Sequence, residues 1–485
     1  MILVLPLVIP VLGAAAVMGF RSARGSAFVA LATGAAEIGA IIRLVLGIRR
    51  YGVIEAGRYL RADDLTAFFL ISLAFILGLV IVYSVGYLQH VPEERFASSR
   101  WFYALFFLFV LTIVAVYLSA NLGLLWILME ATTLASALLV GFYNTEGAVE
   151  AGWKYLIVCT VGLAFALFGT IALYMAAVKS GIDARSALDW ATLMRMAPSL
   201  RPAQDLVKLA FVFLAVGYGT KVGFAPMHSW LPDAHAEAPS PVSAMLSAAL
   251  LNCAMYGLLR CDAITARAIG SSFSHHLLLF FGGFSLVVAG LLMLVQRDLK
   301  RLLAYSSVEH MGIIATGVGL GGPLGLYGAL LHTFNHSLAK SMLFFAAGNV
   351  RENFGTLRME RIGGMARALP LTSATLVVGA CAITGMPPFG LFVSEFAILS
   401  EAFSQSHLVV AILMLGALSL VFGAILFHFL HMLCGDPIGE PAMPSGRRSE
   451  LAVIAICAAC LLFLGLHVPP SLQTLLHNAV QVLQP

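Results

Sequence analysis

The stretch GTKVGFAPMHSWLPDAH, residues 219–235, interrupts an apolar segment at Pro226, where a membrane-spanning helix should continue. A second stretch, ITGMPPFGLFVSEF, residues 383–396, has Pro387 and Pro388 in the same kind of position. A proline inside a helix removes a backbone hydrogen bond and clashes with the carbonyl four residues earlier. Backbone groups freed at membrane depth are tolerated only beside protein or a wet cavity. Two such breaks in corresponding positions predict an inverted-repeat transporter with its ion site near the breaks.

The composition indicates that a membrane surrounds these breaks. Of the 485 residues, 60% are hydrophobic and only 11% are charged, and the mean hydropathy is +0.94. A soluble domain carries about 25% charged residues, so lipid must cover part of this apolar surface. The net charge of +4 is small, and no basic stretch indicates a nucleic-acid partner. The seven cysteines are scattered, and the one CxxC, Cys457 and Cys460, lies inside an apolar helix, so a metal or redox role is not expected.

Apolar stretches near 20 residues predict an all-α polytopic membrane protein with about fourteen transmembrane helices. The expected spans are 2–20, 26–47, 65–88, 101–119, 121–142, 153–178, 205–225, 240–262, 275–295, 301–320, 324–349, 371–399, 407–434 and 450–468. No soluble domain or low-complexity linker separates them, so residues 1–485 are expected to form a single membrane domain. Lysine and arginine are almost evenly divided between the two sides, so the positive-inside rule does not fix the orientation.

The order of charged residues divides the chain into two inverted repeats of five helices. We expect helices 1–3 in residues 1–100, the first repeat (helices 4–8) in 101–262, the second (helices 9–13) in 275–434, and helix 14 in 450–468. Each repeat shows an acid, then a lysine, then a broken helix, which is helix 7 or helix 12. The residues concerned are Glu130, Lys154 and Lys221 in the first repeat and Glu309, Lys340 and Glu395 in the second.

A stripe of ionisable side chains is predicted in the eleventh helix. An unpaired charge in hydrocarbon costs about 2.5–3.5 kcal/mol, so a chain that keeps several needs a reason. His332, His336 and Lys340 recur every four residues, which places neighbours about 40° apart around the helix and about 6 Å apart along it. This step fits proton transfer through one or two waters. The alternatives are packed histidines bonded to backbone, or a metal at the HxxxH, which a nearby lysine cation and the lack of a carboxylate on the stripe oppose.

Glu130 and Lys221 are expected to form a switchable proton store. Burial favours the neutral form of a lysine, whereas an adjacent carboxylate favours the charged form. If Glu130 moves away, Lys221 should release its proton, and the return of Glu130 should reload it. The alternative is a static buried ion pair that only orients helices.

Several other candidates come from the same pattern. Glu309 and His310 are expected to supply the matching acid of the second repeat. Lys154 lies near the start of the sixth helix, so a role in the path competes with snorkelling to the interface. His228 flanks the first break together with Asp233 and His235, where a proton entry path and a hydrogen-bonded loop are both open.

Four motifs resemble those of a known family. They are GTKVGFAPMHSWLPDAHAEAPSPVSAML (219–246), RDLKRLLAYSSVEHMG (297–312), HTFNHSLAKSMLFFAAGNV (332–350) and GMPPFGLFVSEF (385–396). They resemble the antiporter-like subunits shared by respiratory complex I, multisubunit cation/proton antiporters and group 4 membrane-bound hydrogenases, and the likeness covers nearly the whole chain. WILMEATTLASA, YSSVEHMG and the chain length are most similar to the hydrogenase-4 component F branch.

The resemblance assigns roles to individual residues. Glu130 and Lys221 match the family's helix 5 glutamate and helix 7 lysine, and Glu395 matches its helix 12 carboxylate. The stripe from His332 to Lys340 matches the central helix 11 connection. The segment LLNCAMYGLLR departs from the pattern, because Asn252 stands where many complex I relatives have a lysine. An amide can hold water but carries no proton at neutral pH, so the link between the halves would rest on water or be weaker.

The resemblance implies a proton-conducting, non-catalytic membrane subunit of a multisubunit redox complex in a prokaryotic cytoplasmic (inner) membrane. The complex would be a group 4 NiFe hydrogenase or a formate-hydrogenlyase-like assembly, with other membrane subunits and peripheral hydrogenase and iron–sulfur subunits as partners. No GxGxxG, phosphate loop or cysteine cluster indicates a cofactor, and neither a cofactor nor a metal is expected in this chain. The alternatives are a subunit of a cation/proton antiporter, which needs clustered oxygen ligands, a subunit of an NADH:quinone oxidoreductase, and a structural anchor that has lost transport.

Overall fold

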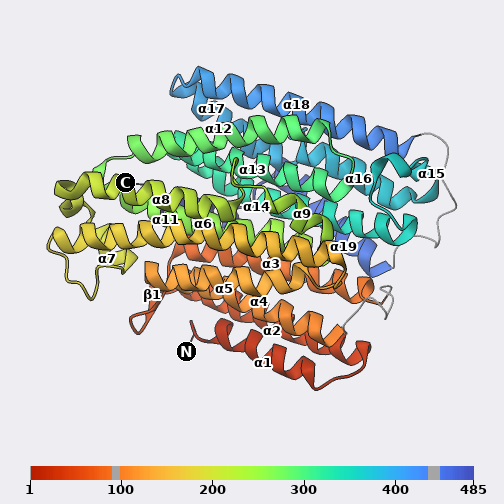
Figure 1. The fold of residues 1–485 in the computed structure, drawn as a ribbon, viewed down its shortest axis with the longest axis horizontal. Helices are drawn as coiled ribbons and strands as arrows, with labels where there is room; N and C mark the ends of the chain where they lie inside the picture. The colour runs from red at the N-terminus through yellow and green to blue at the C-terminus, as the bar shows by residue number, and fades with distance from the viewer. Residues whose placement is uncertain (1, 90–98, 435–447, 485) are drawn as a thin grey trace.

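The computed structural model describes residues 2–89, 99–434 and 448–484. In this part of the chain the fold is almost entirely helical (Figure 1), and the predicted all-α class is confirmed. Residues 90–98, which fall between the expected third and fourth helices, lie outside the described residues. The elements are α1 (Leu5–Met18), α2 (Ala23–Tyr51), β1 (Ile54–Ala56), β2 (Leu60–Ala62), α3 (Asp64–Tyr87), α4 (Ser99–Leu118), α5 (Leu122–Val140), α6 (Glu146–Lys179), α7 (Trp190–Arg195), η2 (Ala197–Ala203), α8 (Gln204–Val222), α9 (Trp230–Glu237), α10 (Ser240–Met245), η3 (Leu246–Leu250), α11 (Leu251–Ile269), α12 (Ser272–Leu294), α13 (Leu299–Leu320), α14 (Gly322–Phe354), η4 (Met359–Arg361), α15 (Met365–Ala368), α16 (Pro370–Ile383), α17 (Gly390–Ser404), α18 (Leu408–Leu433), α19 (Arg448–Leu466) and α20 (Pro470–Leu483).

Eight of the described helices are long and apolar enough to cross a membrane, and the bent pair α19–α20 makes a ninth if it counts as one span. The count of fourteen spans is therefore not established by length and composition. The helices α8, α13 and α14 are not among the eight. They carry the intramembrane lysines, histidines and Glu309, which lower the mean hydropathy of a span.

The long helices run side by side (Figure 1). The segments that carry the predicted ionisable residues form two packed sets, α5, α6 and α8 in the first half and α13, α14 and α17 in the second. The helix α14 lies centrally, since it packs against α13, α16, α17 and α19 and also against α3 and α10. In the first half, α8 packs on α6 and α11, and α6 packs on α5. Small residues allow these close approaches: an added Cβ at Gly217 would lie 2.6 Å from the Ala166 side chain. The bundle thus encloses two separate groups of buried polar side chains.

Two interruptions correspond to the two proline-containing stretches. The helix α8 ends at Val222, and Gly223 follows with a positive φ of 88°. Pro226 lies in the interval before α9 begins, and the Ala225–Pro226 peptide bond is cis. A third interruption was not predicted: the helix that continues from α10 into α11 contains a π-helical turn at η3. All of η3 is buried against α14 and α3.

The second interruption lies between α16 and α17. Gly385 in this interval has a positive φ of 65°, and the interval also contains Pro387 and Pro388, which are joined by a cis peptide bond. Backbone groups freed at such a break need partners at membrane depth. In the second interval the Met386 amide donates to the Cys381 carbonyl at 3.0 Å, although residues 386–388 are exposed. In the first interval the Ala225 amide donates to the Ser285 hydroxyl at 3.0 Å.

The two broken helices point their second segments to opposite ends of the bundle. Asp233 of α9 pairs with Arg301 at the start of α13, and we call this end the α9 end. Glu401 of α17 accepts the Leu324 amide at the start of α14, and we call this the α20 end, because α20 also lies there. Since α13 and α14 are consecutive and run in opposite directions, these starts lie at opposite ends. This relation is what the predicted inverted repeats require.

Several small elements were not predicted. The strands β1 and β2 form a hairpin beside the start of α3, with Ile54 opposite Ala62. The short helices α7 and η2 occupy the polar segment expected as a loop, and α20 follows a 74° bend after α19. Hydropathy could not reveal them because each is too short or too amphipathic to resemble a span.

Candidate functional site

Lys221 is the centre of the first group, which we call the lysine cluster: Lys221, Thr133, Tyr155 and Glu130. Lys221 lies in the last turn of α8 before the break and is fully buried. Its Nζ donates to Thr133 Oγ1 at 2.6 Å and to Tyr155 OH at 2.7 Å. The ammonium also lies 4.9 Å from the centre of the Tyr155 ring, within the range of a cation–π interaction. The buried charge is therefore held by hydroxyl groups from α5 and α6.

Glu130 is not in direct contact with Lys221 in the described residues, which disfavours the alternative of a static buried ion pair. Within the described residues its side chain accepts one hydrogen bond, from the Thr160 hydroxyl to Oε2 at 3.4 Å. Glu130 is half-buried and lies one helical turn before Thr133, so the hydroxyl of Thr133 takes the position next to the ammonium. The two charges therefore interact only through space. A proton store that is loaded or unloaded by movement of Glu130 requires such an arrangement.

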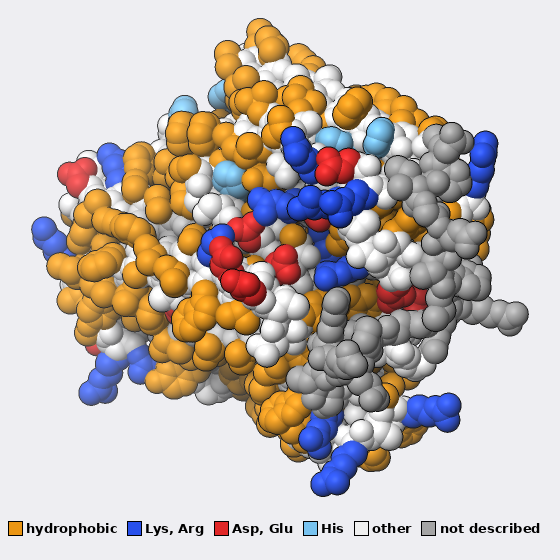
Figure 2. All heavy atoms as spheres, turned by 45° about the vertical axis from the view of Figure 1, so that its right-hand side comes forward, with side chains coloured by type: hydrophobic (Ala, Val, Ile, Leu, Met, Phe, Trp, Pro, Cys, Tyr) orange, Lys and Arg blue, Asp and Glu red, His pale blue; other side chains and the backbone are white. Residues whose placement is uncertain are grey.

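Lys154 lies at the surface, in the group of ion pairs at the α9 end. Its Nζ lies 2.6 Å from Glu150 and 3.5 Å from Asp233, and Asp233 also pairs with Arg301. Figure 2 shows acidic and basic side chains gathered on this end of an otherwise largely hydrophobic surface. The structure therefore separates Lys154 from the buried lysine cluster and favours its interfacial alternative.

His228 and His235 lie at the α9 end, between the two clusters. His228 is buried, its Nδ1 has no hydrogen-bond partner in the described chain, and its ring packs edge-on against Tyr305 at 5.8 Å. His235 is fully buried and stacks on Phe344 at 4.9 Å, and neither ring nitrogen has a partner among the described residues. A hydrogen-bonded loop would satisfy these nitrogens, so the geometry favours a role for water here.

The second group, the histidine cluster, is made of Glu309, His310, His332, His336, Lys340, Ser394 and Glu395. His310 Nδ1 lies 2.8 Å from His332 Nε2, and His332 Nδ1 lies 2.9 Å from the Ser394 hydroxyl. These contacts join α13, α14 and α17 at the second break. A proton can pass along such a series without crossing an apolar gap.

His310 shortens the steps along the predicted stripe. Its ring centre lies 5.0 Å from that of His332 and 5.1 Å from that of His336. A residue from α13 thus stands between two histidines of α14 that are one turn apart. The stripe predicted a step of about 6 Å bridged by water, whereas the fold supplies a side chain for that step.

Glu309 and Lys340 form the inner end of the histidine cluster. Both are fully buried, and the Lys340 ammonium donates to the Leu303 carbonyl at 2.8 Å. Glu309 Oε2 lies 3.7 Å from His310 Nε2, and the Glu309 carboxylate acts electrostatically on Lys340. An acid, a histidine and a lysine therefore adjoin in the second half, where the first half has an acid and a lysine.

Asn252 lies between the two halves. Its amide donates to the Ser337 hydroxyl at 2.8 Å and to the Ala248 carbonyl at 2.6 Å. The amide oxygen is buried and has no partner in the described residues, so it could accept from a water. A parallel connection runs from Ser247, whose hydroxyl lies 2.9 Å from Ser307 and 3.5 Å from His336. Sequence reasoning missed these serines because isolated serines in a helix carry no pattern.

Glu395 adds a carboxylate to two histidines that could together bind a metal ion. His310, His332 and Glu395 offer ligand atoms within 4.8 Å of one another. The stripe on α14 itself carries no carboxylate, but Glu395 reaches it from α17. The two facing nitrogens of His310 and His332 are already hydrogen-bonded to each other. A metal ion would have to displace that shared proton beside the Lys340 cation, so the arrangement fits proton exchange better.

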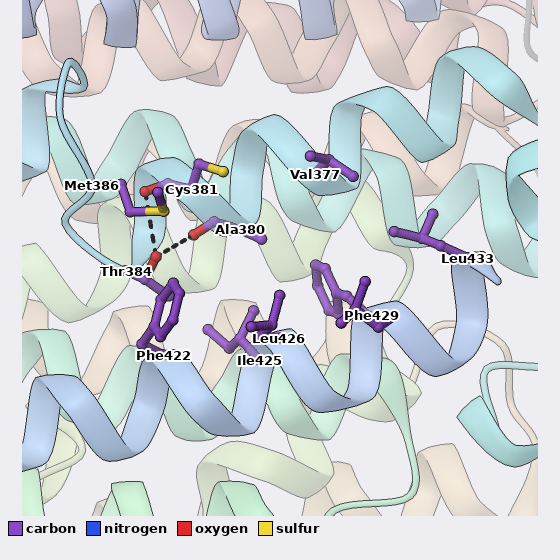
Figure 3. A pocket seen from close by; sticks show the side chains of 11 residues that line it. Val377, Ala380, Cys381, Thr384, Met386, Phe422, Ile425, Leu426, Phe429 and Leu433 are labelled. Atoms are coloured by element: carbon purple, nitrogen blue, oxygen red, sulfur yellow. Dashed lines mark hydrogen bonds between the residues drawn. The ribbon is translucent and has the colours of Figure 1, made fainter.

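An apolar pocket of about 230 Å³ lies beside the second break, between α16 and α18 (Figure 3). Phe422 and Phe429 line one side, and Cys381 and Thr384 line the other. The Thr384 hydroxyl donates to the Ala380 carbonyl at 2.8 Å, so its proton is not available to a molecule in the pocket. This pocket cannot hold a water chain and is separate from the ion path.

Comparison with known proteins identifies the family. Residues 119–422 match the family described as "NADH:quinone oxidoreductase/Mrp antiporter, TM". A "Hydrogenase-4 component F homolog" from Methylacidiphilum infernorum is 38% identical over 387 residues, which cover 79% of this chain and 81% of that protein. The NADH-quinone oxidoreductase subunit N of Desulforudis audaxviator is 32% identical over 416 residues, covering 84% of this chain and 80% of that one. A chain of the membrane-bound sulfane sulfur reductase, an archaeal respiratory membrane complex, superposes with a TM-score of 0.87 at 24% identity over 99% of this chain and 96% of that chain.

The fold and the two buried clusters define an integral membrane protein with ionisable groups inside the bilayer. The chain belongs to the family of transmembrane subunits shared by NADH:quinone oxidoreductases and Mrp antiporters. The predicted family is thereby confirmed, including its similarity to hydrogenase-4 component F.

Proposed function

We propose that this chain is the proton-translocating membrane subunit of a redox complex of the group 4 NiFe hydrogenase or formate-hydrogenlyase kind, in a prokaryotic cytoplasmic membrane. The observation that carries the proposal is the buried series Ser394, His332 and His310, joined at 2.9 and 2.8 Å. The similarity to a hydrogenase-4 component F homolog favours a hydrogenase over other redox partners. Peripheral iron–sulfur subunits would supply the electron transfer, and this chain would supply the protonable groups.

The lysine cluster would act as the proton store of the first half. Thr133 and Tyr155 hold the Lys221 Nζ, and their hydroxyls can accept from an ammonium or donate to a neutral amine. Approach of Glu130 would favour the charged lysine, and its withdrawal would favour the neutral one. A partner that moves α5 would thereby load or unload Lys221.

The histidine cluster would carry protons through the second half. Lys340 and Glu309 would exchange a proton with His310, which passes it to His332 and Ser394. Glu395 would hold the proton beside the second break. We further propose that residues 101–262 and 275–434 are the two inverted repeats, and that Asn252 and Ser247 connect them through water.

Replacement of Lys221 tests this function. In the assembled complex in sealed vesicles, Lys221→Ala should abolish redox-driven proton transport while all subunits still copurify. Lys221→Arg should behave in the same way, because arginine keeps the charge but cannot release its proton. Transport at the wild-type rate by either assembled variant would refute the proposal. Activity that depends on sodium and persists without a redox donor would instead identify cation/proton exchange.

A further inference from the structure

We infer that protons reach the histidine cluster from the α20 end, through a cavity entered beside Asp262 and His275, and that Ile398 forms a dry gate between that cavity and the cluster. This route rests on the proposed proton translocation and adds its point of access. It starts at the end of the bundle opposite the ion pairs of Asp233.

The cavity has a volume of about 580 Å³ and opens where α11 ends and α12 begins. Ser271, Gln405 and Gln484 contribute polar atoms to its lining, and Asp262 and His275 lie in its wall. This volume and these polar groups suit several ordered waters, since a buried water needs two to four polar partners. The apolar pocket beside α18 has no such partners, so the two cavities differ in kind.

Asp262 and His275 are an acid and a base that share the cavity. Asp262 is only 5% exposed, and its Oδ2 lies 3.8 Å from His275 Nε2. Its Oδ1 is buried and has no hydrogen-bond partner among the described residues. A buried carboxylate oxygen without a partner is costly, so water in the cavity is its natural partner. The pair can therefore exchange protons with that water.

The turn between α13 and α14 fixes the entrance. Gly321 and Gly322 have φ values of 66° and 64°, which other residues rarely adopt. An added Cβ at Gly321 would lie 2.7 Å from the His275 ring, and one at Gly322 would overlap the Glu401 carboxylate. Only glycine lets this turn lie against both side chains. His275 and Glu401 are thus held on either side of the turn.

Polar groups continue inward along α17. Gln405, in the cavity wall, donates to Glu401 Oε1 at 2.7 Å. Glu401 Oε2 accepts the amides of Leu324 and Gly325 at the start of α14, the helix of the histidine stripe. Ser394 lies seven residues before Glu401, about two turns away on nearly the same face of the helix, and contacts His332. The route from the cavity therefore needs to cross only the level between Glu401 and Ser394.

Ile398 occupies that level. It is fully buried, and an added Cβ at Gly317 or Gly328 would lie 3.0 or 2.7 Å from its side chain. The two glycines from α13 and α14 thus let the isoleucine fill the space between the helices. An apolar constriction of this kind stops water and ions by dewetting. Water could bridge the cavity and the cluster only when Ile398 moves.

A leak measurement tests the gate. Vesicles that contain the assembled complex, with no redox donor, receive a pH step, and the passive decay of the gradient is followed. Ile398→Ser should leak severalfold faster than the wild type, Ile398→Val should not, and Ile412→Ser, at a 68% exposed site on α18, should serve as a matched control. An assembled Ile398→Ser complex that leaks no faster than the control would overturn the gate.

A second measurement tests the entrance and covers the case in which Ile398→Ser fails to assemble. Asp262→Asn and His275→Gln should each lower redox-driven proton transport severalfold. His467→Gln should not, because this exposed histidine directly follows α19 and is not among the residues that line the cavity. If Lys221→Ala abolishes transport but both entrance variants match His467→Gln, the route is wrong and the function stands. If Lys221→Ala transports normally, the function itself fails.

Discussion

Lys221 and Lys340 are both fully buried, yet their ammonium groups have different partners. Lys221 is bound by two hydroxyls, which can accept from the charged form and donate to the neutral form. Lys340 is bound by the Leu303 carbonyl, which can only accept, and its nearby charge is Glu309. The first lysine can therefore change its charge without losing its partners, whereas the second depends more on its carboxylate.

Lys340→Ala is expected to reduce redox-driven proton transport to background. The substitution removes the inner proton carrier of the histidine cluster and leaves Glu309 without its cation. The measurement is proton transport by the assembled complex in vesicles. Lys208→Ala serves as a control, because Lys208 lies partly exposed near the start of α8 and pairs only weakly with Asp205 at 3.9 Å. Equal transport by the two variants would indicate a structural anchor instead of a proton path.

The ionisable residues themselves could be predicted from the sequence, because a charge inside an apolar segment is conspicuous. Their partners could not, because the partners come from other helices. Glu395 follows the second break in the chain, but its place beside His310 depends on how α17 packs on α13 and α14. Charge alone suggests that Glu130 and Lys221 interact, but it cannot show that Thr133, one turn further along α5, lies next to the ammonium.

At the scale of elements, the two breaks depend on glycine as well as on proline. Gly385 follows α16 with a φ of 65°, and an added Cβ would collide with Glu395 Oε2. The glycine thus lets the Glu395 carboxylate lie against the backbone of the break. Prolines revealed both interruptions in the sequence, whereas the close approach of a side chain to Gly385 could be seen only in the fold.

Gly385→Ala is expected to impair proton transport by displacing Glu395 from the histidine cluster. The positive φ alone should cost about 1–2 kcal/mol, and the collision with Glu395 adds to it. Gly181→Ala is the matched control, because Gly181 has a φ of 84° and nothing within 4 Å of an added Cβ. Both variants should lose some thermal stability, but only Gly385→Ala should lose transport. Normal transport by Gly385→Ala would show that the position of Glu395 is not needed.

At the scale of the whole molecule, a buried ion pair joins the first helices to the first repeat. Arg260 donates to both oxygens of Asp63, at 2.8 and 2.5 Å, and its guanidinium lies 4.0 Å from the Trp190 ring centre. The pair therefore links α11, the start of α3 and the segment of α7. Removing one partner of such a pair leaves the charge of the other partner buried and uncompensated.

Arg260→Ala should destabilise the protein by about 3–5 kcal/mol, the usual cost of breaking a buried pair. The midpoint of thermal unfolding in detergent should fall clearly. Arg61→Ala should have a much smaller effect, because Arg61 contacts the same Trp190 ring at 5.1 Å but is partly exposed and pairs with Glu55. Equal losses in the two variants would mean that the ring contact matters and the ion pair does not.

A neighbouring membrane subunit is expected to cover the outer face of α5. Ile127, Glu130, Leu134 and Leu138 follow one another at steps of three or four residues on this face, and the three apolar members are 56%, 60% and 54% exposed. A carboxylate facing lipid is costly, so protein should cover Glu130. A photocrosslinker at Leu134 should give an adduct with another membrane subunit in the intact complex and none after dissociation. Lipid adducts alone in the intact complex would contradict this interface.

The opposed directions of the two broken helices bear on how the voltage across the membrane acts on the protein. A proton that enters at the α9 end and one that enters at the α20 end cross the field in opposite senses on their way to the interior. Each charge that traverses the whole field gains or loses about 2.3 kcal/mol per 100 mV. A potential that helps to fill the lysine cluster would therefore help to empty the histidine cluster. The same electric field would therefore favour protonation of one cluster and deprotonation of the other.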